Sequence, residues 1–288
     1  MIKSVDFPDK EFASKDELFA ELKKCEKSII EAKTAKIYND CNENLKQSIV
    51  ILNSKEASKA GINTKAGYIY PIVSTTKFYD SHRDVHFDGC FNKTVKEQQG
   101  KVKYCLDHKL EYDSILAYEY AVKMFIAMVD WSLVGKNYQG KTQALVFEIK
   151  EDDIRRKEVL VDIKDDRINF ENSVRMLYVD GKLKLGINST EKQYSENKSY
   201  YDSRISEIAN KEDVEENGYF WGVEELKIWK EASLVVAGGS NSATSILSVK
   251  ENIEEPAAAT PKENTEAAVN LDTVDKETFR NLLKNITK

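Results

Sequence analysis

The chain has 288 residues, of which 41% are hydrophobic and 32% charged, and its formal net charge is -6. This balance is typical of a globular protein, and no apolar run reaches the roughly 20 residues that a membrane helix needs. The basic residues are dispersed among a larger number of acidic ones, so a nucleic-acid partner is not expected. The first residues, MIKSVDFPDKEF, lack the apolar core of a signal peptide. We therefore expect the protein to remain in the cytoplasm where it is made.

Residues 1–58 are expected to form a helical N-terminal arm. Residues 9–48 are rich in Lys, Glu, Ala and Leu and contain neither Gly nor Pro. Ser14 and Glu17 have the spacing of a capping box, which marks the start of a helix. Apolar residues then recur every three or four positions, as at Leu18 and Leu22. This spacing predicts an amphipathic helix that packs on a neighbour.

Residues 59–250 are expected to form the main domain, which is rich in strands. Short runs of aromatic and β-branched residues favour strands: AGYIYPIVS, KVKYCL, SILAYEYAV, QALVFEI, KLKLGI and ASLVVA. Helical patches interrupt them at FNKTVKEQQG and SRISEIANKEDVEENG. Because strands and helices do not alternate regularly, we expect an α+β fold, mainly an antiparallel β-barrel decorated with helices.

Residues 251–288 are expected to form a flexible linker followed by a tail helix. The segment opens with ENIEEPAAATPKENTEAAVN, a composition typical of a flexible tether. Near the end, Phe279, Leu282, Leu283 and Ile286 recur at helical spacing. The pattern predicts a short amphipathic helix, which serves either as a docking element or as a removable tail.

The sequence contains few residues suited to catalysis or metal binding. It has no P-loop, GxGxxG, HExxH or GxSxG motif. Its four cysteines are too widely spaced for a metal knuckle or a redox pair and are interpreted as small apolar residues. His82 and His86 alternate with acidic residues in DSHRDVHFDGCF. That segment is interpreted as a solvated loop, with a metal site as the less favoured alternative, and no cofactor is expected.

His108 is the leading candidate for acid–base chemistry because it follows the apolar run KVKYCL, at the end of a predicted strand. The stretch from Tyr70 to Ala117 resembles the start of the tailed-phage prohead protease family, whose fold is like that of the herpesvirus assemblins. In that family an Asp-rich turn and a G-x-F sequence open a helix, and a second strand ends in the catalytic histidine. The matching residues here are Asp80, Asp84, Gly89-Cys90-Phe91, the helix from Asn92, and YCLDH ending at His108.

A second block, KEASLVVAGGSNSAT, resembles the acidic-residue strand of the same family. That strand reads E-x-S-x-V, followed by Asn and Ala; the counterparts here are Glu231, Ser233, Val235, Asn241 and Ala243. The resemblance implies that Glu231 holds the imidazole of His108. Asp107 is a competing orienting carboxylate, although it is the sequence neighbour of His108.

The nucleophile is expected on a strand between the two blocks. Ser189 lies at the end of the predicted strand in YVDGKLKLGINSTEKQY and is assigned this role. Family members usually carry a Ser-x-Gly sequence on that strand, whereas the corresponding stretch here reads Lys184-Leu185-Gly186. Either the register differs or the copy lacks a nucleophile. Ser233 is the fallback, on the same strand face as Glu231.

The resemblance implies a serine endopeptidase that matures the phage procapsid. Its expected substrates are the scaffold, the removable arm of the major capsid protein, and the protease itself, inside the procapsid in the host cytoplasm. The alternative is an inactive relative that serves as an internal scaffold; a third hypothesis is an unrelated carbohydrate- or peptide-binding β-domain. Related folds with this chemistry are often activated by dimerisation, so a homodimer stays open. Neither a membrane nor a nucleic acid is expected as a partner.

Overall fold

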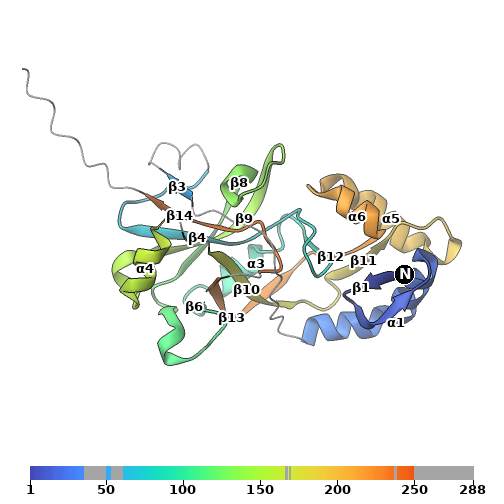
Figure 1. Ribbon diagram of the computed structural model, residues 1–288, viewed down its shortest axis with the longest axis horizontal. Coiled ribbons are helices and arrows are strands. Elements are labelled where there is room, and N and C mark those ends of the chain that lie inside the picture. The colour runs from blue at the N-terminus through green and yellow to red at the C-terminus, as the bar shows by residue number, and fades with distance from the viewer. Residues whose placement is uncertain (36–49, 53–60, 166–167, 169, 237–238, 250–288) are drawn as a thin grey trace, which may run out of the picture. The chain divides into compact units, whose positions relative to one another are not determined.

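The computed structural model describes residues 1–35, 50–52, 61–165, 168, 170–236 and 239–249 (Figure 1). Residues 1–251 form one compact unit, and residues 252–288 form a second unit outside the described residues. The expected linker and tail helix at 251–288, and Cys41 in the expected arm, also lie outside the described part of the chain.

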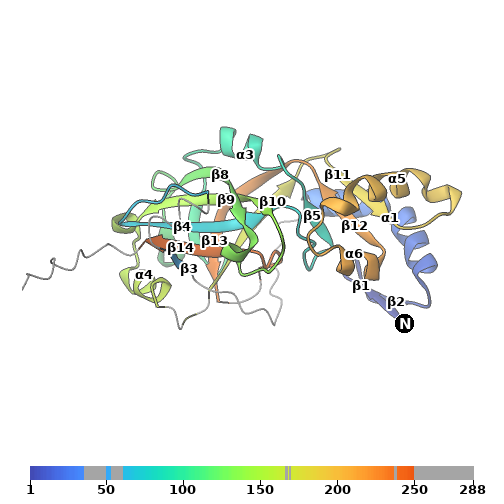
Figure 2. The same cartoon turned by 90° about the horizontal axis from the view of Figure 1, so that it is seen from above.

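The strands that the structure describes form four open sheets. The largest has the order β3 (Val50–Leu52), β14 (Ser245–Val249), β4 (Tyr68–Thr75), β9 (Lys141–Lys150) and β8 (Lys123–Asp130). Figure 2 shows β8, β9, β4 and β14 side by side. A second sheet has the order β10 (Glu171–Tyr178), β13 (Leu226–Val235), β6 (Lys103–Leu106) and β7 (Ile115–Ala117).

The two smaller sheets complete the strand pairing. The three-stranded sheet contains β11 (Leu183–Ile187), β12 (Tyr219–Val223) and β5 (Asp84–His86), and the two-stranded sheet contains β1 (Ile2–Ser4) and β2 (Phe7–Phe12). Most strand pairs are antiparallel, but β12 with β5, β13 with β6, and β14 with β3 are parallel. The mixed α+β class is confirmed. Among the described residues the four strand orders are linear, and the strand pairing that would close a barrel is not seen.

Helices lie around these sheets. The α-helices among the described residues are α1 (Lys15–Ala35), α3 (Asn92–Glu97), α4 (Lys157–Ile163), α5 (Ser195–Arg204) and α6 (Lys211–Asn217). Single 3-10 turns occupy Tyr112–Ser114, Trp131–Val134, Glu151–Asp153, Lys192–Tyr194 and Ile205–Glu207. As predicted, α3 starts at Asn92, directly after a turn in which Gly89 adopts a φ of 95°, a conformation that suits glycine. None of the helices that can be described is long and apolar enough to span a membrane.

Helix α1 begins at the predicted cap. The Glu17 N–H donates to Ser14 Oγ over 3.3 Å, and Glu17 Oε2 accepts from the Ala13 N–H over 2.8 Å. The predicted apolar stripe is buried at Leu18 and Leu22, and the helix lies against β10 and β11. Residues 9–12, which the composition predicted as helical, belong instead to strand β2.

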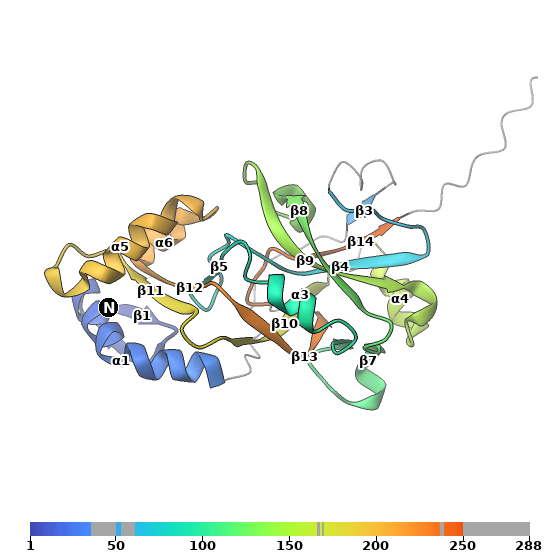
Figure 3. The same cartoon turned by 180° about the vertical axis from the view of Figure 1, so that it is seen from behind.

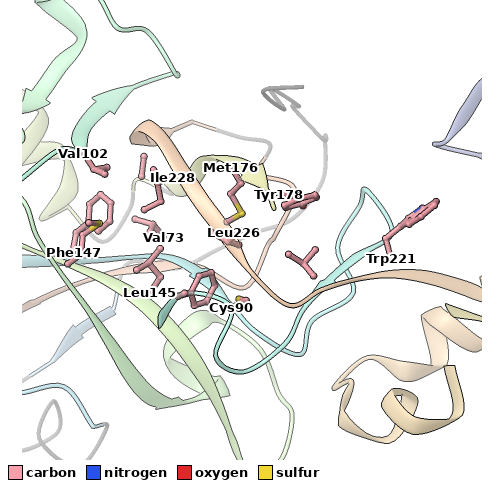
Figure 4. Close-up of a cluster of buried hydrophobic side chains, with 14 of the residues drawn as sticks. Val73, Cys90, Val102, Leu145, Phe147, Met176, Tyr178, Trp221, Leu226 and Ile228 are labelled. Atoms are coloured by element: carbon pink, nitrogen blue, oxygen red, sulfur yellow. The ribbon is translucent and has the colours of Figure 1, made fainter. Parts of the chain in front are cut away.

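One hydrophobic core joins the two largest sheets. Figure 4 shows Val73, Leu145 and Phe147 of the five-stranded sheet in one cluster with Leu226 and Ile228 of β13. A buried polar link crosses the same boundary at Asn172 on β10. Its side-chain oxygen accepts from the Tyr104 hydroxyl over 2.7 Å, and its Nδ2 donates to the Ser245 carbonyl over 2.9 Å. These bonds fix β10 against both sheets.

A buried lysine ties the N-terminal segment to the sheets. The ammonium of Lys33, near the end of α1, lies 2.6 Å from Asp84 Oδ1 and 3.9 Å from Asp6 Oδ1. The Tyr178 hydroxyl donates to the other oxygen of Asp84 over 2.7 Å, and Trp221 Nε1 donates to Asp6 over 3.2 Å. Segments from four parts of the chain therefore depend on one buried cation.

We predict that Lys33→Met lowers the free energy of unfolding by about 3–5 kcal/mol, because the substitution leaves the Asp84 carboxylate buried without its cation. Urea unfolding followed by circular dichroism measures the change. The matched control is Lys27→Met on the same helix. Lys27 is almost fully exposed and lies 3.9 Å from Glu31, so its loss should change stability by no more than about 0.5 kcal/mol. Equal effects of the two substitutions would contradict the prediction.

Candidate functional site

The candidate site lies on the face of the four-stranded sheet that points away from the main hydrophobic core, where β13 runs between β10 and β6. Figure 3 shows β13 beside β10 in this region, with α3 next to it. On β13, Ala232 and Leu234 point into the core, so Glu231 and Ser233 point to the opposite face. Ser233 has Ser173 as its direct partner on β10 and Cys105 as its partner on β6. These side chains therefore share one face of the sheet.

His108 reaches this face because the chain turns sharply after β6. Asp107 and His108 both adopt the left-handed conformation, with φ of 47° and 56°, at a cost of about 1–2 kcal/mol for each residue. Two hydrogen bonds hold the turn against β13: the Asp107 N–H donates to the Leu234 carbonyl over 3.0 Å, and the His108 N–H donates to Ser233 Oγ over 3.1 Å. Strain of this kind is often found at functional sites.

Glu231 is the centre of the site. Its carboxylate is fully buried, and Oε1 lies 2.8 Å from Nδ1 of His108. The Ser233 hydroxyl donates to Oε2 over 2.6 Å. The competing carboxylate, Asp107, is exposed, so Glu231 is the group that binds the imidazole. Since a carboxylate can only accept, the neutral imidazole carries its proton on Nδ1 and leaves the Nε2 lone pair free to accept another.

Arg175 on β10 completes the surroundings of Glu231. Its Nε lies 3.1 Å from Glu231 Oε1, and its Nη2 donates to the His108 carbonyl oxygen over 2.6 Å. The guanidinium also lies 5.6 Å from the ring centroid of Trp229. The buried carboxylate is thus matched by a cation and by two neutral donors, which is what burial of a charge requires.

The structure does not bring Ser189 to this pair. Ser189 follows β11, whose last residue, Ile187, pairs with Tyr219 at the start of β12. Glu231 lies in the second half of β13, beyond the opposite end of β12. The Ser189 hydroxyl accepts instead from the Glu191 N–H of its own turn, over 3.4 Å. Ser189 therefore follows a strand of a different sheet from the one that holds His108 and Glu231.

Ser173 is the serine that the sequence analysis missed. It is half-buried on β10, directly opposite Ser233, at the Cβ separation of about 4.5–5.5 Å that such pairs show. Ser233 itself is fully buried and already donates its proton to Glu231, which makes it a poor nucleophile. The signal that could have found Ser173 is its place in ENSVRMLY, between the two blocks in sequence.

The Gly of the expected Ser-x-Gly stretch has a packing role. A Cβ at Gly186 would lie 2.8 Å from an edge carbon of the Phe220 ring, on the neighbouring strand β12. Lys184 is exposed, and its ammonium lies 3.0 Å from Glu224. This stretch therefore carries a close strand contact and a surface ion pair.

The second histidine cluster is buried, which corrects the interpretation of a solvated loop. Asp80, His82 and Asp84 place potential metal-ligand atoms within 4.8 Å of one another, and all three are buried. The Lys33 ammonium is bound to Asp84, however, and Asp80 Oδ1 accepts the N–H groups of His82 and Asp84, each over 2.9 Å. A lysine already supplies the positive charge, so the chemistry of this cluster does not favour a metal ion.

A cleft of about 540 Å³ opens beside the first residue of β10. Glu171 lines it, two residues before Ser173 on the same strand, and Lys136 and Arg83 contribute cations to its wall. Lys136 donates to Ser242 over 2.9 Å, and burial lowers the pKa of its ammonium. The cleft and the candidate site therefore share strand β10.

Comparisons of the chain with protein-family models, with curated proteins and with solved structures find no match.

We predict a pH dependence of stability that comes from His86. Burial lowers the pKa of this histidine from 6.5 to about 4. Because the pKa of His86 is lower in the folded state than in the unfolded state, its stabilising contribution to the free energy of unfolding is fully present above pH 6.5. This contribution is lost as the pH falls to 4, by up to about 3 kcal/mol. His86→Gln should remove this part of the slope when urea unfolding is measured at several pH values.

The titration of Asp80 changes the stability in the opposite direction. Its effect cancels when the pH dependence of His86→Gln is compared with that of the wild type. Burial, with the neighbouring Asp84, raises its pKa to about 6, so protonation of Asp80 adds stability as the pH falls below that value. Asp80 is present in both proteins, and the difference between their slopes isolates His86. Identical slopes for the wild type and His86→Gln would contradict the prediction.

Proposed function

We propose that the chain is a serine endopeptidase in which His108 is the general base, Glu231 orients the imidazole and Ser173 is the nucleophile. The observation that carries the proposal is the contact of 2.8 Å between His108 Nδ1 and the buried Glu231 carboxylate. These two residues lie 123 positions apart, and a strained turn is maintained to bring them together. Ser173 lies on the same sheet face, one strand away.

The arrangement supports acyl transfer in two stages. The Nε2 lone pair of His108 takes the proton of the Ser173 hydroxyl as Oγ forms a bond to the carbonyl carbon of an extended peptide. Glu231 stabilises the resulting imidazolium. The imidazolium then gives its proton to the amide nitrogen as the C–N bond breaks, which leaves an ester on Ser173. Water, activated by the same histidine, hydrolyses the ester and restores the serine.

The resemblance to the prohead proteases supports a role in capsid maturation. The two sequence blocks that carry it supply His108 and Glu231, the two residues that meet. In this proposal the enzyme cuts the scaffold, the arm of the major capsid protein and itself, within the procapsid in the host cytoplasm. The proposal includes the β-barrel architecture of that family. It is supported by the buried hydrogen bond from Asn172, which joins β10, the edge strand of the four-stranded sheet, to β14 of the five-stranded sheet.

The second candidate function is an inactive, protease-like internal scaffold of the procapsid. The observation that favours it is that Lys184 occupies the position of the serine in the Ser-x-Gly sequence of the family. Its ammonium pairs with Glu224. Among the described residues, no hydrogen bond joins Ser173 to His108. Catalytic hydrogen bonds are often long without substrate, so the two candidates differ in activity rather than in fold.

We predict that His108→Ala abolishes cleavage and leaves the fold intact. Removal of a general base costs about 10²–10⁴-fold in rate or more. The measurement follows purified full-length chain by intact mass spectrometry, for self-shortening, together with cleavage of added capsid protein and scaffold. Circular dichroism should match that of the wild type. Cleavage at the wild-type rate by the variant would remove His108 from the mechanism, and an inactive wild type would favour the scaffold function.

We predict opposite outcomes for two serines. Ser173→Ala should eliminate cleavage, because the hydroxyl that attacks the peptide is gone, whereas Ser189→Ala should cleave at the wild-type rate. A serine-reactive phosphonate should label the peptide that contains Ser173, as read by tandem mass spectrometry, and should not label His108→Ala. Labelling at Ser189 or Ser233 would move the nucleophile, and full activity in all three alanine variants would exclude serine catalysis.

A further inference from the structure

The proposal concerns Arg175, which lies on β10 two residues after the candidate nucleophile. Its partly covered side chain, about 12% exposed, extends across β13 and contacts the His108 turn from the side opposite β6. Arg175 binds a side chain and a backbone carbonyl that belong to the two halves of the candidate dyad.

His108 is held at three points, and each depends on Glu231. The ring binds Glu231 Oε1 directly over 2.8 Å. The backbone N–H binds Ser233 Oγ, whose proton goes to Glu231 Oε2. The backbone carbonyl accepts from Arg175 Nη2, while Nε of the same guanidinium contacts Glu231 Oε1 over 3.1 Å. The four residues form a closed network of hydrogen bonds and one ion pair.

The planar guanidinium is the group that can close this network. Its fixed fork binds two acceptors in different directions at once, which a single ammonium cannot do with the same geometry. The Trp229 ring lies 5.6 Å from the guanidinium carbon and restricts it on another side. Because Asp107 and His108 both stand in the left-handed conformation, the turn needs such external bonds to persist.

We propose that Arg175 is a positioning residue: it fixes the His108 turn and the Glu231 carboxylate so that the imidazole directs its Nδ1–H to Glu231 and its Nε2 toward Ser173. This inference rests on the proposed function for its kinetic consequence only. The geometry of the imidazole can be measured whether or not the protein cleaves a peptide.

The test uses full-length protein with ¹⁵N-labelled histidine. The chain has three histidines, so the imidazole signal that is missing from the spectrum of His108→Ala belongs to His108. The wild type should show a downfield, slowly exchanging Nδ1 proton for His108, as expected for a charge-assisted bond to a carboxylate. In Arg175→Met this signal should disappear or move upfield. Arg175→Lys, which keeps the charge but not the fork, should restore it in part.

The kinetic arm separates positioning from plain stability. If the protein cleaves peptide, Arg175→Met should lower kcat by about 100-fold, the size expected when a reacting group is misplaced by about 1 Å, with little change in KM. Arg175→Lys should recover part of the loss. A purely structural arginine would lower the melting temperature and leave the imidazole signal and the kcat of the folded protein unchanged.

The matched control is Arg204→Met. Arg204 also combines a carboxylate partner, Glu207 at 2.9 Å, with an aromatic ring, Phe87 at 4.7 Å, but it is the last residue of α5, away from the dyad. Arg204→Met should leave the His108 signal and kcat unchanged.

An unaltered Nδ1 signal in folded Arg175→Met would overturn the proposal. If Arg175→Met does not fold, an Arg175→Lys protein with the full wild-type signal and kcat would overturn it. An inactive wild type with a signal that depends on Arg175 would leave the positioning role standing and reject the protease.

Discussion

The buried carboxylate of Glu231 is the constraint on which the site depends. A charge without solvent contact must be matched, and here a guanidinium, an imidazole and a hydroxyl all bind it. Each of these groups is placed by a different strand: Arg175 by β10, Ser233 by β13, and His108 by the turn after β6. The requirement to satisfy one carboxylate therefore fixes the mutual position of three strands and keeps the strained turn at His108 in place. These contacts hold the groups of the site in fixed positions.

A second buried charge uses the same principle for a structural purpose. Lys33 supplies the positive charge that Asp84 and Asp6 require, and it binds the N-terminal helix to strands β5, β10 and β12 through their side chains. The cluster contains one histidine and two carboxylates at metal-ligand spacing, yet the carboxylates are already engaged by an ammonium and by backbone N–H groups. The two clusters have similar composition but different accessibility: the Lys33 ammonium and Asp84 are almost completely buried, whereas His108 keeps part of its ring exposed. This difference explains why a chemical role is proposed for the cluster around Glu231, whereas a structural role is assigned to the cluster around Lys33.

Strand register decides which serine faces the histidine. Consecutive residues on a strand point to opposite faces, so the pairing of Ser173 with Ser233 places the hydroxyl of Ser173 on the face that carries His108. A shift of one residue would turn it into the core. The β-bulge between Val174 and Met176 falls opposite Lys230, whose φ of 64° lets β13 absorb extra residues just before Glu231. The irregularity brings Arg175 level with Glu231 and is therefore part of the site.

The sequence by itself determined the local features of this protein. The α+β class, the cap at Ser14 and Glu17, the start of α3 after Gly89, and the strands around YCL and ASLVV all follow from periodicity, capping and turn chemistry, which act over a few residues. The resemblance to the prohead proteases, together with the place of His108 after KVKYCL, also singled out His108 and Glu231. Tertiary structure decided the rest. Strand β10 was missed because its polar residues, Glu171, Asn172, Ser173 and Arg175, hide the alternation of a strand; they are polar because they serve a sheet boundary and a buried carboxylate. The separation of Ser189 from the dyad, and the burial of His82 and His86, depend on which strands pair across long stretches of chain. The pairing of strands that lie far apart in the sequence depends on how the whole core buries its apolar side chains and matches its charges. This cannot be derived from any short segment of the sequence.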